Sequence, residues 1–296
     1  MFRFIFPQDK AVSKEVFSLA FPVILSNLSR VLMSMADVAM VGRLGAEALA
    51  ATGMGAMLFW GALSLVLGIR TAVQTVASRR LGQKIDHEAG TAFHNGLIMA
   101  TLYALPVSLA GWLWAKDIIP FFIDDATATP LAVDYTGIVF ISLLFSAYSF
   151  VFQGFFTGVE KTKIHMTVTI TSNVINVYLN AGLIYGSEGV KSFFIEAAPP
   201  LSFISHLWQW TSFPALGVKG AAIATLVASL WMSVHYGAYL FSKQIKTRFA
   251  VFSFSVDRVM MNRQLRLAVP QGLQEMFIAV GWSMFYKIVG MIGLIE

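Results

Sequence analysis

The chain has 296 residues, of which 57% are hydrophobic and only 12% are charged. A typical soluble protein has about 25% charged residues, so a soluble fold of this length would have too few charges to cover its surface. The mean hydropathy of +0.69 and the long apolar runs instead predict an all-α, multi-pass membrane protein. The absence of cysteine excludes disulfides and thiolate metal sites.

Seven segments are long enough to cross a bilayer, which takes about 20 mostly apolar residues in a helix. In chain order they are 17–42, 54–78, 92–114, 134–158, 165–186, 216–241 and 265–294. Pro22, Pro106 and Pro270 fall inside three of them. We expect these prolines to bend their helices rather than end them, because neighbouring helices can satisfy the freed carbonyl groups.

The Lys and Arg residues between the segments predict the orientation of the chain. With the N-terminus inside the cell, fourteen of them lie in cytoplasmic segments and four lie outside, namely Arg43, Lys116, Lys191 and Lys219. Cytoplasmic loops of membrane proteins carry an excess of Lys and Arg. We therefore expect a cytoplasmic N-terminus in a cell membrane, either plasma or inner.

The first and seventh segments share a motif. Leu19-Ala20-x-Pro22 followed by Val41-Gly42-x-x-Gly45 recurs 248 residues later, as Leu267-Ala268-x-Pro270 followed by Val289-Gly290-x-x-Gly293. Transporters are often built from such repeats. We expect a six-helix N-terminal lobe over 1–242, a basic cytoplasmic linker over 243–263, and over 264–296 the first helix of a second, truncated lobe.

Polar side chains at membrane depth are costly and usually mark a ligand or ion pathway. In the first segment Asn27, Arg30, Ser34 and Asp37 follow at helical spacings that predict one shared face. A carboxyl group in a cavity there can release a proton or be neutralised by a sodium ion, so Asp37 is the candidate ion-coupling residue. The alternative is a structural ion pair between Asp37 and Arg30.

Further polar residues follow in later segments. The fifth segment carries Asn173, Asn176 and Asn180, whose amides would either line a cavity and coordinate a cation or hold helices together. In the fourth segment Gln153 shares a face with several serines, where a role in helix contacts is favoured over ligand binding. In the seventh segment, Glu275 follows Asn27 by 248 residues, which is the offset of the repeat. The two lobes would therefore present polar groups at the same depth in the membrane.

Several chemistries are missing from the sequence. There is no H-E-x-x-H motif, no phosphate-binding G-x-x-x-x-G-K-[ST] loop and no catalytic cluster, so we expect neither an enzyme nor a bound cofactor. The five histidines are scattered, and we interpret them as surface or interface residues. The expected partners are the lipid bilayer and small amphipathic or cationic compounds; no nucleic acid or protein partner is predicted.

Three runs of residues are similar to the multidrug and toxic compound extrusion (MATE) transporters. They are the run from Pro22 through Asp37 to Gly45, the run Gln153-Gly154-Phe155-Phe156-Thr157-Gly158, and the run Asn176-Val177-Tyr178-Leu179-Asn180. The resemblance implies a twelve-helix protein of two six-helix lobes that exports cationic or amphipathic compounds against an inward flow of protons or sodium ions. It implies that Asp37 is the coupling carboxylate in a cavity of the N-terminal lobe, with Asn176 and Asn180 as its polar partners, and these three residues are the candidate ligands of a sodium ion.

The chain departs from the MATE pattern in two places. Asn180 stands where some branches of the family have an aspartate, which removes a second titrating group. Ile278 stands where many members have a glutamate, about one helical turn after Glu275.

Two alternatives stay open from the sequence. A lipid-linked oligosaccharide flippase has the same lobe architecture and favours a more cationic cavity, for which Arg30 and Arg70 are candidates. A seven-helix retinal protein or receptor is prompted by Lys287 in the last segment, but the loop charges and the internal repeat oppose it.

Overall fold

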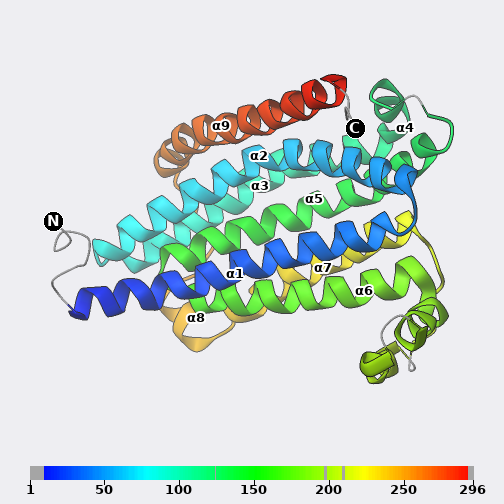
Figure 1. Cartoon of the computed structure of the whole chain (residues 1–296). Helices are drawn as coiled ribbons and strands as arrows, with labels where there is room; N and C mark the ends of the chain where they lie inside the picture. The colour runs from blue at the N-terminus through cyan, green and yellow to red at the C-terminus, as the bar shows by residue number, and fades with distance from the viewer. Residues whose placement is uncertain (1–9, 124, 197–198, 209–210, 293–296) are drawn as a thin grey trace, which may run out of the picture.

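The computed structural model describes residues 10–123, 125–196, 199–208 and 211–292, and it is a bundle of long helices lying side by side (Figure 1). The long helices are α1 (Lys10–Gly42), α2 (Ala46–Gly82), α3 (Asp86–Leu113), α5 (Ala128–Gly158), α6 (Thr162–Glu196), α7 (Val218–Leu240) and α9 (Arg258–Ile292). The short ones are α4 (Ala115–Ile118), η2 (Ile119–Phe121), η3 (Pro199–Trp208) and α8 (Lys243–Phe249). The end of the bundle that carries α4 and η3 is called the α4 end, and the opposite end is called the α8 end.

Each predicted segment coincides with one long helix, which confirms the all-α prediction. Within the described residues, α1, α2, α3, α5 and α7 are long and apolar enough to cross a membrane by length and composition alone. The helices α6 and α9 are absent from this set. They carry amide and carboxyl side chains in mid-helix, including Asn176 and Glu275, and these lower their hydropathy.

The helices pack so that α2 and α5 lie at the centre. α2 contacts α3, α5 and α9, α5 also contacts α3 and α7, and α6 packs along α1 and α7. The core between them is apolar, with Val66, Phe93, Leu143 and Phe155 fully or almost fully buried. Because α1 lies against α6, the polar stripes of these two helices meet.

The helices α9 and α2 lie side by side (Figure 1), and small residues let their backbones approach closely. A Cβ atom added at Gly68 on α2 would collide with the carbonyl oxygen of Ala268 on α9. A Cβ at Gly272 would lie 2.8 Å from the Cα atom of Leu65. The two backbones therefore approach closely, as membrane helices do where they meet at small residues.

The predicted linker is folded onto α3. Phe249 of α8 is fully buried, and a Cβ atom added at Gly90 would collide with its carbonyl oxygen. The Nε2 atom of the buried His94 lies 2.8 Å from the carbonyl oxygen of Val251, while the backbone N–H of Ser255 donates to Nδ1 at 3.3 Å. These contacts hold the segment between α8 and α9 against the α8 end of the bundle.

The helix α9 begins at Arg258, earlier than the predicted boundary at 264. The side chain of Asp257 accepts hydrogen bonds from the backbone N–H groups of Val259 and Met260, at 2.8 and 3.1 Å. This is the N-cap geometry that satisfies the free donors of a first helical turn. Asn95 on α3 donates to the carbonyl oxygen of Asp257 at 3.0 Å, so the start of α9 is fixed to α3.

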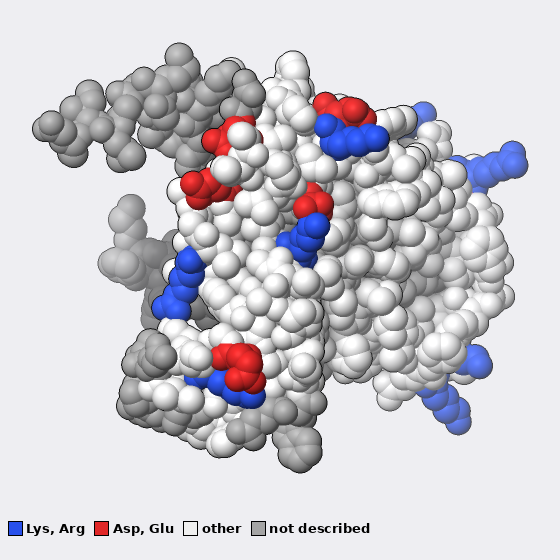
Figure 2. Space-filling model, turned by 90° about the vertical axis from the view of Figure 1, so that its right-hand side faces the viewer, with Lys and Arg blue, Asp and Glu red and all other residues white. Residues whose placement is uncertain are grey.

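At the α4 end, α6 is interrupted at Gly186, whose φ of 74° and ψ of 161° are not helical. The chain then returns through η3, where Trp208 stacks on Tyr178 at 4.9 Å between ring centroids. Figure 2 views this end and shows Lys and Arg beside Asp and Glu in a few separate groups on a mostly uncharged face. One such ion pair joins Lys219 to Asp134 at 3.0 Å.

Candidate functional site

Two cavities between the helices have mostly apolar walls that also include several polar side chains. The Asp37 cavity, of about 280 Å³, includes Asp37, Asn180 and Tyr135 in its lining. The His165 cavity, of about 170 Å³, includes His165 and Gln153. The two cavities adjoin, because they have four lining residues in common: Arg30, Met33, Phe59 and Trp60.

A chain of hydrogen bonds joins α1 to α6 at the Asp37 cavity. The Nδ2 atom of Asn180 donates to the Oδ1 atom of Asp37 at 2.6 Å and to the Oδ1 atom of Asn176 at 3.0 Å. Both asparagines are buried. Among the described residues Asp37 is the only acidic one that lines this cavity, so its carboxylate is the one negative charge there that attracts a cation.

The oxygen atoms at this place suit a small hard cation or a proton. The Oδ1 atom of Asn180 is buried and accepts no hydrogen bond, and it belongs to the residue that contacts the Asp37 carboxylate. Carboxylate and amide oxygens are the ligands that hard cations prefer. In the described part of the chain no group of three or more His, Asp or Glu side chains is placed to hold a metal ion.

Arg30 is not the partner of Asp37. The ion pairs among the described residues are Arg80–Glu88, Lys191–Glu188, Lys219–Asp134 and Arg248–Asp86. The alternative of a structural Asp37–Arg30 ion pair is therefore wrong. The two residues are seven positions apart on α1, so their Cα atoms are about 10 Å apart along the helix axis.

The His165 cavity contains a hydrogen-bonded group that the sequence analysis missed. The Nδ1 atom of His165 lies 2.7 Å from the hydroxyl of Tyr236, and the Nε2 atom lies 3.1 Å from Nε2 of Gln153. With the Gln153 amide donating to Nε2, the proton of the imidazole is on Nδ1 and is donated to Tyr236. The interpretation of every histidine as a surface or interface residue is wrong for His94 and His165, which are both almost fully buried.

A signal for His165 was present in the sequence. It lies four residues before Thr169, which itself lies four residues before Asn173, so it extends the polar stripe of α6 by one turn. Nothing comparable marked Tyr236, which stacks on Phe152 and Phe156 of α5.

The other predicted site residues divide into two groups. Ser34 lines the Asp37 cavity, and Asn173 lines the His165 cavity while donating to Ser29 at 2.8 Å. Asn27 is exposed on α1, and neither cavity includes it. Glu275 on α9 accepts a hydrogen bond of 3.2 Å from Gln271, and it also lines neither cavity.

The position of Asn27 has a geometric reason. Asn27 precedes Asp37 by ten positions, so it lies about 15 Å away along the helix axis at a rise of 1.5 Å per residue. Of the four polar residues predicted to share a face of α1, Arg30, Ser34 and Asp37 line the Asp37 cavity. The side chain of Lys287 lies outside the described part of the chain.

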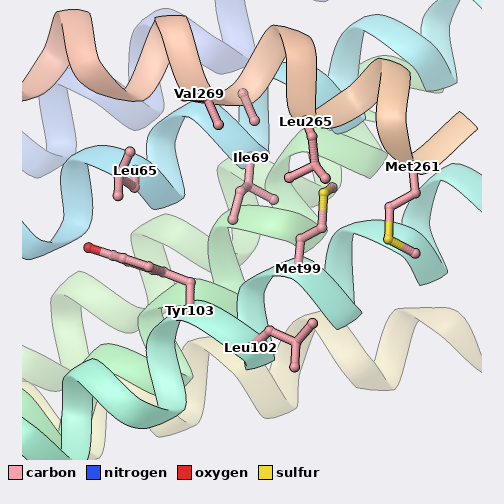
Figure 3. A pocket seen from close by; sticks show the side chains of 9 residues that line it. Leu65, Ile69, Met99, Leu102, Tyr103, Met261, Leu265 and Val269 are labelled. Atoms are coloured by element: carbon pink, nitrogen blue, oxygen red, sulfur yellow. The ribbon is translucent and has the colours of Figure 1, made fainter. Parts of the chain in front are cut away.

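A third cavity, of about 340 Å³, lies between α2, α3 and α9 (Figure 3). Its lining is almost wholly apolar, with Leu65, Met99 and Leu265 pointing into it. The one polar side chain, Tyr103, donates its hydroxyl proton to the carbonyl oxygen of Ala62 at 2.7 Å. This cavity therefore offers no charged group to bind an ion.

Comparison with known proteins places this geometry in context. The model of the MatE family matches residues 22–181, from the first helix to the polar stripe of α6. The multidrug resistance protein NorM of Burkholderia vietnamiensis is 24% identical over 269 residues, which are 89% of this chain and 53% of NorM. A probable NorM of a Synechococcus species is 26% identical over 207 residues, 70% of this chain and 44% of that protein. The chain thus spans about half the length of the relatives it matches.

Solved structures show the same fold at low identity. An outward-facing multidrug resistance MATE transporter of the MOP superfamily superposes with a TM-score of 0.75 at 20% identity, over 92% of this chain and 54% of that one. A MOP superfamily transporter from Pyrococcus furiosus, described as having a binding pocket of reverse polarity, superposes equally well, with a TM-score of 0.75 at 21% identity and the same coverage.

Proposed function

We propose that this chain, which belongs to the MatE family, forms the N-terminal lobe and the first helix of the second lobe of a multidrug exporter driven by protons or sodium ions. Its membrane-spanning helices carry the likeness to relatives named as multidrug resistance proteins. The observation that carries the proposal is the contact of Asp37 with Asn180 at the wall of a cavity suited to a small amphipathic compound.

The proposed mechanism is competition for one charge. A cationic compound pairs with the Asp37 carboxylate, and a proton or sodium ion neutralises the same carboxylate and releases the compound. A protein alternates between two states only as far as each ligand favours one of them. Competition at Asp37 lets the compound and the ion each favour a different state. If the ion is sodium, Asn176 and Asn180 supply further oxygen ligands.

The proposed orientation has the N-terminus in the cytoplasm. The excess of Lys and Arg in the segments at the α8 end supports it, because cytoplasmic loops carry this excess. In this orientation the Asp37 cavity lies in the outer half of the bundle and the His165 cavity in the inner half.

Equilibrium binding tests the proposal on the chain itself. The purified chain in nanodiscs is titrated with the cationic dye ethidium, and bound dye is measured by fluorescence anisotropy. Addition of sodium ions or of acid should displace the dye, and comparison of the two identifies the coupling ion. Asp37→Asn should weaken dye binding about tenfold, the size of one charge-assisted contact, and should abolish displacement.

The matched control is Asp134→Asn. It also removes one carboxylate, but one that is paired with Lys219 at the α4 end. The proposal predicts that this variant keeps both dye binding and displacement. Unchanged ethidium binding by Asp37→Asn would refute the assignment of Asp37.

A lipid-linked oligosaccharide flippase is the second candidate function. The observation in its favour is Arg30, a cation in the wall of both cavities that takes part in none of the ion pairs of the described residues. A lipid pyrophosphate that displaces ethidium from the chain more strongly than simple cations do would favour the flippase. The retinal or receptor alternative loses its support, since the chain belongs to a transporter family.

A further inference from the structure

Three contacts between helices frame the apolar cavity of α2, α3 and α9. The first is the close approach of α2 and α9 at Gly68. In the second, the fully buried side chain of Gln264 on α9 donates to the carbonyl oxygen of Ala92 on α3 at 2.9 Å. In the third, Tyr103 on α3 donates to the carbonyl oxygen of Ala62 on α2 at 2.7 Å. The cavity is therefore set by how the three helices pack and not by one side chain.

The cavity is exposed at the side of the bundle, between α3 and α9. Leu102 of α3 is 71% exposed, and Leu265 and Val269 of α9 are 41% and 47% exposed. Figure 3 shows Leu265 and Met99 extending toward one another from the two helices. In a membrane-spanning bundle, exposed apolar side chains face the hydrocarbon of the bilayer. The cavity therefore opens toward the acyl chains of the lipids.

The lining of this cavity suits a hydrocarbon chain. Its side chains are those of Leu, Ile, Val, Met and Ala, together with Tyr103, whose hydroxyl proton is donated to Ala62. Two of them, Met99 and Met261, have flexible side chains that adapt to an irregular shape. Such a lining excludes a charged compound, because the charge would lose its hydration without gaining a partner.

An exposed arginine lies one helical turn from the cavity. Arg258, the first residue of α9, precedes Met261 by three positions and Leu265 by seven, and these spacings place the three residues on one face. Arg258 takes part in none of the ion pairs of the described residues. Val269, at the far end of the cavity, lies about 16 Å further along the helix axis. This length is about half of the ~30 Å hydrocarbon core of a bilayer, so it matches one leaflet.

We propose that the apolar cavity and Arg258 form a binding site for one anionic phospholipid, in which Arg258 binds the headgroup and an acyl chain fills the cavity. In the proposed orientation the α8 end lies in the cytoplasm, and the cytoplasmic leaflet carries anionic lipids that bind basic sites between membrane helices. A lipid bound there contacts α3 and α9 together. The inference uses the proposed orientation and is independent of the exported compound and the coupling ion.

Two phospholipids with the same acyl chains test the inference. Dioleoyl phosphatidylglycerol is anionic, and dioleoyl phosphatidylcholine has no net charge. Each is titrated into the purified chain in detergent, and native mass spectrometry counts the lipids bound to each chain. The wild-type chain should bind its first phosphatidylglycerol about fivefold more tightly than its first phosphatidylcholine, which is the effect of one arginine near a membrane surface.

Variants assign the headgroup and the acyl chain separately. In Arg258→Gln the preference for phosphatidylglycerol should disappear. Arg263→Gln is the matched control and should keep it, because Arg263 is also exposed on α9 but lies about 140° around the helix from Arg258. Leu265→Trp fills the cavity and should remove most of the binding of both lipids. Leu267→Trp should leave binding unchanged, since Leu267 is exposed and does not line the cavity.

The possible failures are distinguishable. Equal affinities of the wild-type chain for the two lipids, or a preference that persists in Arg258→Gln, would overturn the proposal, and so would unchanged binding in Leu265→Trp. A wild-type chain that binds neither lipid and appears as a dimer in the same spectra would assign the cavity to a second copy and also overturn it. Ethidium binding at the Asp37 cavity is measured separately, so these failures leave the proposed function standing. The wild-type comparison of the two lipids is decisive even if the variants do not fold.

Discussion

The carboxylate of Asp37 on α1 accepts a hydrogen bond of 2.6 Å from the side-chain amide of Asn180 on α6. The same nitrogen donates to Asn176 at 3.0 Å, so one amide group serves two acceptors. The residues lie far apart in the sequence, and their contact joins the polar stripes of the two helices.

Asn180→Ala should destabilise the chain by about 1 kcal/mol, up to about 2, which is the range measured for hydrogen bonds between membrane helices. The variant leaves the oxygens of Asp37 and Asn176 without their donor. Thermal unfolding of the purified chain in detergent measures the effect. Asn27→Ala is the control, since Asn27 is exposed on α1 and should leave the midpoint unchanged.

Gly68→Val should weaken the packing of α9 on α2. The new side chain collides with the carbonyl oxygen of Ala268, and overpacking of this kind costs about 1–3 kcal/mol. Gly61→Val is matched in chemistry and helix, but a Cβ atom there has no neighbour within 4 Å. Equal unfolding midpoints for the two variants would contradict the close contact of α2 and α9.

His94→Ala should release the segment between α8 and α9. The backbone N–H of Ser255 loses its acceptor, and its hydrogen exchange should speed up by about tenfold, corresponding to about 1.4 kcal/mol of lost protection. The exposed His87, on the same helix, provides the control variant His87→Ala. Unaltered exchange at Ser255 in His94→Ala would show that His94 does not hold this segment.

The start of α5 should respond to pH through Asp125. Its carboxylate accepts hydrogen bonds from the backbone N–H groups of Ala128 and Thr127, at 2.7 and 2.9 Å, and from the Thr127 hydroxyl at 2.7 Å. These bonds, the one from Ala128 first, hold the pKa of Asp125 below its usual value. Because the folded pKa is the lower one, the stabilisation is complete above the unfolded value of about 4 and is lost as the pH falls through the folded pKa.

Amide exchange of Ala128, corrected for the intrinsic rate at each pH, measures this effect. Protection should fall on acidification in the wild-type chain. In Asp125→Asn, whose side chain cannot ionise but still caps a helix, protection should not depend on pH in this range. A wild-type amide whose protection stays constant through acid pH would contradict the role of the Asp125 carboxylate.

Much of the fold could be predicted from the sequence, and less of the site. Runs of apolar residues located all seven long helices, and the polar stripe on α6 was visible as Asn173, Asn176 and Asn180. The sequence did not show which polar residues of α1 line a cavity: Arg30, Ser34 and Asp37 do, and Asn27 does not. The linker was expected to be a plain basic connection, yet buried contacts of Phe249 fold it onto α3.

The sequence by itself determined the class of protein, the helices and the polar residues at membrane depth, because hydropathy and helical periodicity are properties of neighbouring residues. The tertiary structure decided between Asn180, which the family resemblance implied as a partner of Asp37, and Arg30, and it alone placed His165 in a cavity with Tyr236. Those contacts depend on which helix lies against which. Glycines such as Gly68 let helices that are far apart in the chain approach closely, and this helps to set which helices pack together.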